Sequence, residues 1–331
     1  MNKQDITSLF ENFNQLNVLI VGDVMIDAYF FGKVDRISPE APVPVVSVQR
    51  KENRLGGAAN VALNIQALGA NPILCSVIGN DTEAILFDEL LKTTQLSNKG
   101  IIKSTNRITT VKTRVIGNNH QMLRVDAEID HNLIDEDKKL LIEKITSILA
   151  SEKIDVVIFE DYDKGILSKE VIKSVVEICN SKNIPTTVDP KKRNFLHYKN
   201  VSLFKPNLKE LKEGLNIDIN PKNKSEIEAA VFQLNQLLKN KNTFITLSEN
   251  GVYITDHQNN FHEPAHVRNI SDVSGAGDTV ISVASLCLAL QLPIQQVAAL
   301  ANLAGGLVCE KVGVVPINKD ELLAEALIKL I

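Results

Sequence analysis

The segment Asp272-Val-Ser-Gly-Ala-Gly-Asp278 carries the strongest indication of chemistry in this chain of 331 residues. Its Gly275-Ala276-Gly277 turn leads directly into an apolar stretch with the composition of a buried helix. Such a turn can direct consecutive backbone N–H groups at one anion, and the helix dipole favours negative charge at the same place. Asp278 adds a carboxylate that could accept a proton beside that anion. A plain helix N-terminus with small residues for close packing is the alternative, and the local pattern leaves both open.

Two familiar kinds of phosphate-binding loop are excluded. No Gly-Lys-Ser or Gly-Lys-Thr follows the turn, so it is not the P-loop of the NTPases. No Gly-x-Gly-x-x-Gly follows the first apolar run, so the dinucleotide-binding fingerprint is missing as well. That run ends at Asp23, with Asp27 just after it, and ligands of open α/β sheets bind beyond the carboxyl ends of the strands. Asp23 could equally be a turn residue.

Short apolar runs alternate with stretches of helical period along most of the chain. This alternation predicts an α/β fold with a mostly parallel sheet and helices on both faces. The expected strands are residues 17–23, 71–79, 154–161, 184–190, 243–248 and 252–256. Helices are expected at 57–68 and 82–93, after the capping residues Ser168, Ser225 with Glu228, and Asn318 with Glu321, and as a pair within the uncharged segment 279–309.

Two stretches break this rhythm, residues 28–50 and residues 103–126. The first is rich in aromatic residues, Pro and Val, and the second alternates with Lys112 and Arg114 on one side and Val111, Thr113 and Val115 on the other. We interpret them as a small β lid inserted into one domain that spans residues 1–331. Because a small sheet of this kind is marginal alone, the lid is also expected to form the contact of a homodimer.

Composition excludes several classes of partner. The net charge of −4 offers no basic field for nucleic acid. Gln291 and Pro293 divide the uncharged segment 279–309, so two buried helices are favoured over a membrane span. The four cysteines lack metal-binding spacing and are expected to be reduced, and the N-terminus does not resemble a signal peptide. A cytoplasmic protein is expected.

Two segments in the same order resemble the signatures of the ribokinase-like (PfkB-type) sugar kinases. Asp272 to Asp278 is similar to the C-terminal signature, and Gly56-Gly57-Ala58-Ala59-Asn60 through Leu68-Gly69 is similar to the N-terminal one. The resemblance covers nearly the whole chain. It implies a three-layer α/β/α sandwich and ATP-dependent transfer of a phosphoryl group to a sugar hydroxyl.

Several strings resemble heptose 7-phosphate kinases more narrowly. They are RISPEAPVPVV at 36–46, LRVDAE at 123–128, EDYDKGIL at 160–167, VDPK at 188–191 and KPNLKE at 205–210. These kinases make the 1,7-bisphosphate of D-glycero-D-manno-heptose for lipopolysaccharide cores. Glu160 and Asp163 depart from the resemblance, which has small residues there. Such kinases often carry a fused nucleotidyltransferase domain, and here a separate one is expected.

The resemblance assigns roles residue by residue. Asp278 would be the catalytic base, and the N–H groups of Gly275, Ala276 and Gly277 would hold the transferring phosphoryl group. Asp27 would hold sugar hydroxyls, with Gly56, Gly57 and Asn60 placed against the sugar. Nucleotide would bind at Ser248, Gly251 and Asn302. Asn207 and Glu210 would organise Mg²⁺ through water, with no direct metal ligand, although the pair could also cap a helix. Dependence on a monovalent cation is left open.

A phosphorylated acceptor would need fixed cations. The candidates are Lys112, Arg114 and Arg124 in the lid and Lys164 and Lys191 at strand ends. Other readings are a ribokinase-fold kinase for another sugar or a nucleoside, a non-catalytic sugar-binding protein on the same fold, and, more distantly, a dinucleotide-dependent oxidoreductase. A pure binding protein needs no base, so Asp278 with its intact turn favours a kinase. The anomer and the phosphorylated position stay undetermined by sequence.

Overall fold

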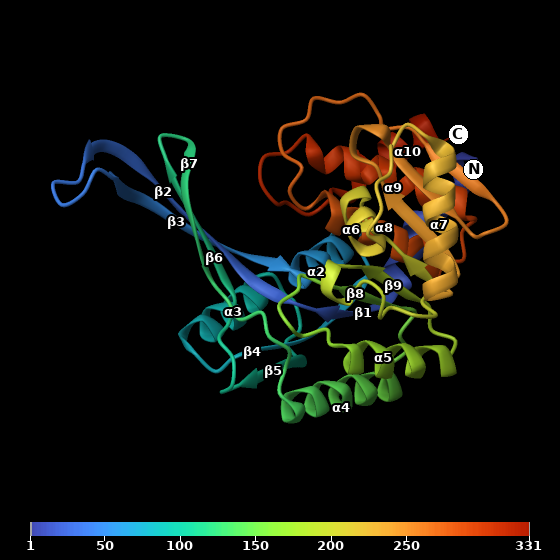
Figure 1. Ribbon diagram of the computed structural model, residues 1–331, viewed down its shortest axis with the longest axis horizontal. Helices are drawn as coiled ribbons and strands as arrows, with labels where there is room; N and C mark the ends of the chain where they lie inside the picture. The colour runs from blue at the N-terminus through green and yellow to red at the C-terminus, as the bar shows by residue number, and fades with distance from the viewer. Residues whose placement is uncertain (1, 331) are drawn as a thin grey trace.

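The computed structural model describes residues 2–330, which form one large sheet, a small sheet and surrounding helices (Figure 1). The α-helices are α1 (Lys3–Asn12), α2 (Ala58–Ala67), α3 (Thr82–Thr93), α4 (Asp135–Ser151), α5 (Lys169–Ser181), α6 (Leu208–Leu215), α7 (Lys224–Leu238), α8 (Ala276–Ala289), α9 (Ile294–Cys309) and α10 (Lys319–Lys329). The strands are β1 (Asn17–Gly22), β2 (Val24–Ile37), β3 (Pro44–Gly57), β4 (Asn71–Gly79), β5 (Gly100–Ser104), β6 (Val111–Gly117), β7 (His120–Ala127), β8 (Val156–Glu160), β9 (Thr186–Asp189), β10 (Leu203–Phe204), β11 (Asn242–Thr246), β12 (Val252–Thr255) and β13 (Asn260–Glu263).

The large sheet has the order β13-β12-β11-β10-β9-β8-β1-β4-β5. Strands β5 through β11 in this order pair in parallel, and only β12 and β13 join as antiparallel edge strands. The carboxyl ends of β1, β8 and β9 therefore lie at one edge, and they carry Gly22, Glu160 and Asp189. This is the edge at which an open α/β sheet binds ligands.

Helices cover both faces of the large sheet, so the predicted three-layer α/β/α sandwich is confirmed. Alternate residues of β1 enter opposite cores: Val18 and Ile20 pack with helices α1, α2, α8, α9 and α10, while Leu19 and Val21 pack with α4, α5, α6 and α7. This period of two is what a strand buried on both faces requires. In the described part of the chain, no helix combines the length and the hydropathy needed to cross a membrane.

The small sheet, which we call the lid, has the order β3-β2-β6-β7 and projects away from the body of the protein (Figure 1). Its strands occupy 24–57 and 111–127, so the lid is longer at its first part than the predicted 28–50. Residues 103 and 104 belong to β5 of the large sheet and not to the lid, because their backbone groups pair with β4.

The last strand of the first lid segment, β3, joins the body of the protein at Gly57. Gly57 ends β3 and precedes α2 with φ +60°, and a Cβ atom there would lie 2.3 Å from the Asp23 carbonyl oxygen. Only a residue without a side chain fits this close approach at a positive φ. The predicted helix 57–68 is confirmed as α2, which begins one residue later.

Candidate active site

The Gly275-Ala276-Gly277 turn begins α8. Gly275 has φ +79° and is the N-cap, and Asp278 lies in the first turn of the helix. The Ala276 N–H donates to the Val273 carbonyl at 3.3 Å, so this group is already partly engaged within the turn. The small residues and the helix start create the positive end that an anion needs.

Asp278 is buried and held by two side chains from distant parts of the chain. Its Oδ2 accepts a hydrogen bond from the Asn60 amide at 2.6 Å, and its Oδ1 accepts one from the Tyr162 hydroxyl at 2.9 Å. Burial raises the pKa of Asp278 to about 6; the hydrogen bond from Asn60 opposes this shift, and repulsion from Asp189 adds to it. An oriented carboxylate with a pKa near neutrality suits a general base.

Several ionisable side chains lie around Asp278 at the carboxyl ends of the strands. Glu160 and Asp189 are buried, and Asp189 Oδ2 lies 2.8 Å from the Nζ atom of the fully buried Lys205. Burial raises the pKa of Glu160 well above its ordinary value, and the negative charges of Asp189 and Asp278 raise it further. Buried charges are costly unless they are paired, and Lys205 supplies this pairing for Asp189.

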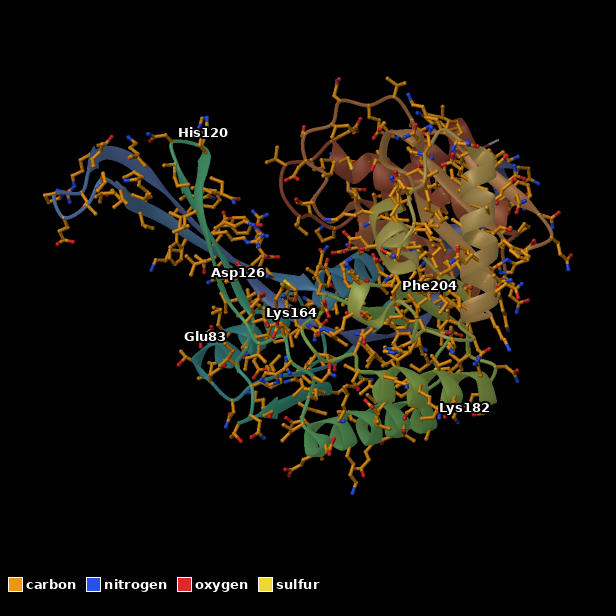
Figure 2. The ribbon with its side chains drawn as sticks, in the orientation of Figure 1. Glu83, His120, Asp126, Lys164, Lys182 and Phe204 are labelled. Carbon is orange, nitrogen blue, oxygen red and sulfur yellow. The ribbon has the colours of Figure 1, made fainter. Side chains whose placement is uncertain are left out.

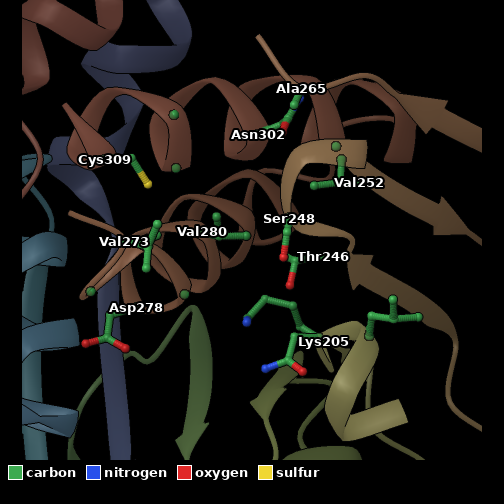
Figure 3. A pocket seen from close by; sticks show the side chains of 18 of the residues that line it. Lys205, Thr246, Ser248, Val252, Ala265, Val273, Asp278, Val280, Asn302 and Cys309 are labelled. Carbon is green, nitrogen blue, oxygen red and sulfur yellow. The ribbon is translucent and has the colours of Figure 1, made fainter. Parts of the chain in front are cut away.

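A cavity of about 1050 Å³ opens beside this group and contains both charged and apolar lining (Figure 3). Asp278 lies at one end of the view, and Thr246, Ser248 and Lys205 lie across the cavity from it. Apolar side chains form another part of the wall: Val252, Ala265, Val267, Ile270, Val273, Val280 and Cys309. A nucleotide has the same two parts, an apolar base and a charged phosphate chain.

Ten of the predicted site residues line this one cavity. They are Gly275, Ala276, Gly277, Asp278, Asn207, Glu210, Ser248, Gly251, Asn302 and Lys191. The fold thus brings the expected nucleotide residues together with the expected base. Lys191, which the sequence predicts at the sugar phosphate, lines the same cavity, with its Nζ 2.5 Å from Glu210 Oε1.

Asn207 and Glu210 form a capping box at the start of α6. Asn207 Oδ1 accepts from the Glu210 N–H and Glu210 Oε2 accepts from the Asn207 N–H, both at 2.8 Å. The other Glu210 oxygen binds Lys191, so both carboxylate oxygens have partners within the protein. This arrangement fits a hydrated Mg²⁺ held through water better than direct coordination, since Mg²⁺ keeps several of its waters. The ion would offset charge on the phosphates.

The remaining predicted residues lie on the lid side of Asp278. Arg114 NH1 lies 2.6 Å from Asp27 Oδ1, and Gly56 is next to the same carboxylate, because a Cβ at Gly56 would lie 2.3 Å from Asp27 Oδ2. A Cβ at Gly275 would lie 3.4 Å from the Asn60 Nδ2 atom, which connects this side to the turn. Asn60 and Asp278 thus mark the boundary between the two halves of the site.

Each lid-side cation has a carboxylate partner. Lys112 contacts Asp126 and Glu128 at 3.0 and 2.6 Å, and Lys164 contacts Glu128 at 2.8 Å. Arg124 contacts Asp126 at 3.0 Å, and its side chain is 53% exposed. Asp126 and Lys164 lie near the root of the lid, whereas His120 lies at its tip (Figure 2). Arg124 is therefore the most accessible of these cations.

Asp23 binds backbone N–H groups with its side chain. Its carboxylate accepts from the N–H groups of Tyr162, Lys164 and Ile166 at 2.8, 3.1 and 3.1 Å. The buried carboxylate thus fixes the loop that presents the Tyr162 hydroxyl to Asp278. Of the two roles considered for Asp23, the structure supports the turn residue.

Sequence reasoning missed four residues of the site: Tyr162, Glu160, Asp189 and Lys205. All four stand at or just after the carboxyl ends of strands β8, β9 and β10. A polar residue directly after a buried apolar strand is the signal that could have found them. The same signal was used for Asp23 and Asp27 and for the cations Lys164 and Lys191, but not for these four residues.

The three-layer fold, the anion-binding turn and the oriented carboxylate together define a phosphotransferase. The sequence matches the family described as "pfkB family carbohydrate kinase" over residues 15–320. The chain belongs to this family and is a kinase that phosphorylates a sugar hydroxyl.

The chain is also similar to curated proteins named "Bifunctional protein HldE". The protein from Methylobacillus flagellatus is 39% identical over 305 residues, which is 92% of this chain and 62% of that protein. The protein from Campylobacter curvus is 36% identical, over 93% of this chain and 64% of that protein. The chain thus spans somewhat less than two thirds of the length of these relatives.

Solved structures support the fold. Phosphofructokinase-2 from Escherichia coli in complex with fructose-6-phosphate has a TM-score of 0.75 and 16% identity, covering 94% of this chain and 98% of that one. Arabidopsis thaliana ribokinase complexed with ribose and ATP has a TM-score of 0.69 and 15% identity, covering 93% and 98%. The expected ribokinase-like fold is confirmed by these likenesses.

Proposed function

We propose that this kinase transfers the γ-phosphoryl group of ATP to the anomeric hydroxyl of D-glycero-D-manno-heptose 7-phosphate, giving the 1,7-bisphosphate. The observation that carries the proposal is the position of Asp278. Its carboxylate, held by Asn60 and Tyr162, stands where the nucleotide cavity meets the lid side with Asp27 and Arg114. The similarity to the HldE proteins and the string RISPEAPVPVV at 36–46 support a heptose phosphate as the acceptor.

Each part of the site has a role in this reaction. Asp278 takes the proton of the attacking hydroxyl, and the turn at Gly275, Ala276 and Gly277 stabilises the charge on the transferring group. Asp27, Gly56, Gly57 and Asn60 hold the sugar. Mg²⁺, held through water near Asn207 and Glu210, neutralises phosphate charge, and Ser248, Gly251 and Asn302 line the nucleotide site.

The cellular setting follows from the same proposal. The enzyme works in the cytoplasm, which fits four buried cysteines that are all free. A nucleotidyltransferase activity converts the product further. The chain acts as one kinase domain with its lid, and it is a homodimer through that lid. Dependence on a monovalent cation can be measured by assays of ADP release.

A second candidate is a kinase of this family for an unphosphorylated sugar or a nucleoside. It is favoured by one observation: Lys112, Arg114, Arg124 and Lys164 already have carboxylate partners, so a phosphate would have to compete for them. Release of ADP with a panel of sugars and sugar phosphates separates the candidates.

We expect heptose 7-phosphate to exceed free heptose in kcat/KM by about 100-fold or more. Two or three charge-assisted hydrogen bonds to the phosphate, at roughly 1.5–3 kcal/mol each, are sufficient for this preference. Arg124→Ala should lower kcat/KM by about tenfold or more with the phosphorylated sugar and much less with the free one.

The control for this variant is Lys139→Ala, which removes an exposed cation on α4 that is paired with Glu143 of the same helix. It should leave both sugars unchanged. Equal kcat/KM for the two sugars in the wild-type enzyme would reject the heptose phosphate and favour the second candidate.

A further inference from the structure

Two lysines from distant parts of the chain share one carboxylate at the root of the lid. Glu128 Oε2 lies 2.6 Å from the Nζ atom of Lys112, and Glu128 Oε1 lies 2.8 Å from the Nζ atom of Lys164. Lys112 belongs to β6 of the lid, whereas Lys164 belongs to the loop after β8 that carries Tyr162. Glu128 directly follows β7, so its carboxylate joins the lid to the body of the protein.

These three side chains are mostly shielded from solvent. The exposed fractions are 13% for Lys112, 17% for Lys164 and 25% for Glu128. Burial raises the pKa of Glu128, but the hydrogen bonds from the two lysines outweigh it and leave the pKa below its ordinary value. Glu128 is therefore ionised at neutral pH. Salt screens such a partly buried group less than it screens exposed ion pairs.

The root of the lid holds more donors than its carboxylates use. Arg107 is 7% exposed, and its NH2 atom donates to the Lys164 carbonyl oxygen at 2.6 Å. The Nε and NH1 atoms of Arg107 are buried and have no hydrogen-bond partner within residues 2–330. Buried donors without an acceptor are unfavourable, so this region favours the arrival of a further anion.

The contacts of Glu128 have the geometry that a phosphate group would have in the same place. A carboxylate that presents one oxygen to each of two ammonium groups can be replaced by a phosphate that presents two of its three oxygens. A phosphate monoester also carries about 1.5–2 negative charges at neutral pH, compared with one for the carboxylate. Lys112 pairs in register with Asp27, so its side chain lies on the lid face of the proposed sugar-binding residues.

We propose that Glu128 occupies the subsite for the phosphate group of the acceptor in the free enzyme, and that a phosphorylated sugar displaces it from Lys112 and Lys164. The inference rests on the proposed phosphorylated acceptor and names the group with which its phosphate competes. Glu128 neutralises the two lysines until the substrate arrives, and by competing it lowers the affinity of the enzyme for phosphate. A sugar without a phosphate leaves the contact in place.

The test is the binding of inorganic phosphate to the enzyme without nucleotide and sugar, followed by phosphorus nuclear magnetic resonance. Glu128→Gln keeps the size of the side chain and removes its charge. We expect this variant to bind phosphate at least about fivefold more tightly than the wild type, because the competing carboxylate is lost. Adding Lys164→Gln to Glu128→Gln should abolish the gain, which separates this subsite from phosphate bound at the Gly275 turn.

The control is Glu152→Gln, which removes a carboxylate that pairs with Lys99 away from the lid. It should keep the phosphate affinity within about twofold. If Glu128→Gln fails to fold, Glu128→Asp shortens the same side chain by one methylene group and should also bind phosphate more tightly. Unchanged or weaker phosphate binding in the folded Glu128 variant would overturn the proposal.

Kinetics separate this competition from a purely structural contact. Glu128→Gln should lower KM for heptose 7-phosphate by about fivefold and leave KM for free heptose within about twofold. A contact that only fixes the lid would instead raise KM for both sugars, and that result would also overturn the proposal. Equal use of the two sugars by the wild type rejects the proposed acceptor, whereas the phosphate titration needs no sugar and decides separately whether Glu128 competes with phosphate.

Discussion

The Asp278 carboxylate has both of its oxygens held by side chains from other parts of the chain. Asn60 donates from the first turns of α2 and Tyr162 from the loop after β8. Such double support fixes the direction in which the remaining lone pairs point, which matters more for proton abstraction than the basicity alone. The sequence predicted Asn60 as a sugar ligand; its amide also orients the base.

Replacing Asp278 by Asn tests its role as the base. Asparagine keeps the size and can still accept from Tyr162, so the nucleotide cavity should stay intact. We expect turnover to fall by about 10²–10⁴-fold, the typical effect of losing a general base, while ATP affinity changes little. Steady-state kinetics with nucleotide titration measure both, and a variant that keeps more than a tenth of the wild-type rate would contradict the assignment.

At the residue scale, a motif that lies within a short segment can be predicted from sequence. The residues of 272–278 and 56–60 lie close in sequence, and their turn geometry is local. Tyr162, Glu160 and Lys205 could not be found this way, because their importance comes from tertiary contacts with Asp278 and Asp189. For the Lys and Arg residues predicted to bind phosphate, the sequence identifies the charged residues, but it does not predict which carboxylates pair with them.

Helices were predicted most reliably where the spacing of apolar residues and the residues that cap or break a helix indicate the same boundaries. The helix 82–93 and the helix pair within 279–309 are confirmed as α3, α8 and α9, and Ser168 caps α5 as expected. The predicted cap at Ser225 is wrong, because Asn223 accepts from the Ser225 N–H and begins α7 two residues earlier. No element is predicted for α4, although Leu141, Ile145 and Ile148 recur at helical spacing.

Asp81 ties the start of α3 to the segment that leads into the lid. Its carboxylate caps Ala84 and also accepts from the Thr109 N–H and hydroxyl, at 2.8, 2.7 and 2.7 Å. Burial raises the pKa of Asp81, but these hydrogen bonds outweigh it and leave the pKa below its ordinary value. A carboxylate with this direction of shift stabilises the folded state when ionised.

We expect Asp81→Ala to lower the free energy of unfolding at pH 7 by about 1–2 kcal/mol, the usual loss for an N-cap. Because the folded-state pKa is lowered, the difference from wild type should be complete above the ordinary carboxyl pKa near 4 and shrink as pH falls below it. Urea denaturation across pH measures this. Asp135→Ala, an exposed first-turn residue of α4, should have little effect, and equal loss in both variants would contradict the assigned role.

The whole molecule combines a closed sandwich with a lid that has two different faces. Partners in register lie on the same side of a sheet, so Asp27 and Tyr29 share a face with Lys112 and Arg114, while Ala28 and Phe30 share the other with Thr113 and Val115. The first face carries the proposed sugar-binding residues. The second continues onto β7 through Leu123 and Val125, which pair with Val115 and Thr113. The alternation in the sequence predicted these two faces but not how far the lid extends.

The apolar face of the lid predicts self-association. Leu123 and Val125 are 57% and 52% exposed, and β3 and β7 are the edge strands of the lid. A small sheet with an uncovered apolar face and open edges gains stability by pairing with a second copy.

Light scattering at micromolar concentration should give about 73 kDa, twice the 36.5 kDa of one chain. Leu123→Asp combined with Val125→Asp should shift this mass to the monomer, because the exposed positions tolerate charge in the monomer but not inside an interface. The control is Phe232→Asp, which places a charge at an even more exposed apolar residue on α7 and should leave the dimer intact. A monomeric wild type, or a dimer that survives the double substitution, would contradict association through the lid.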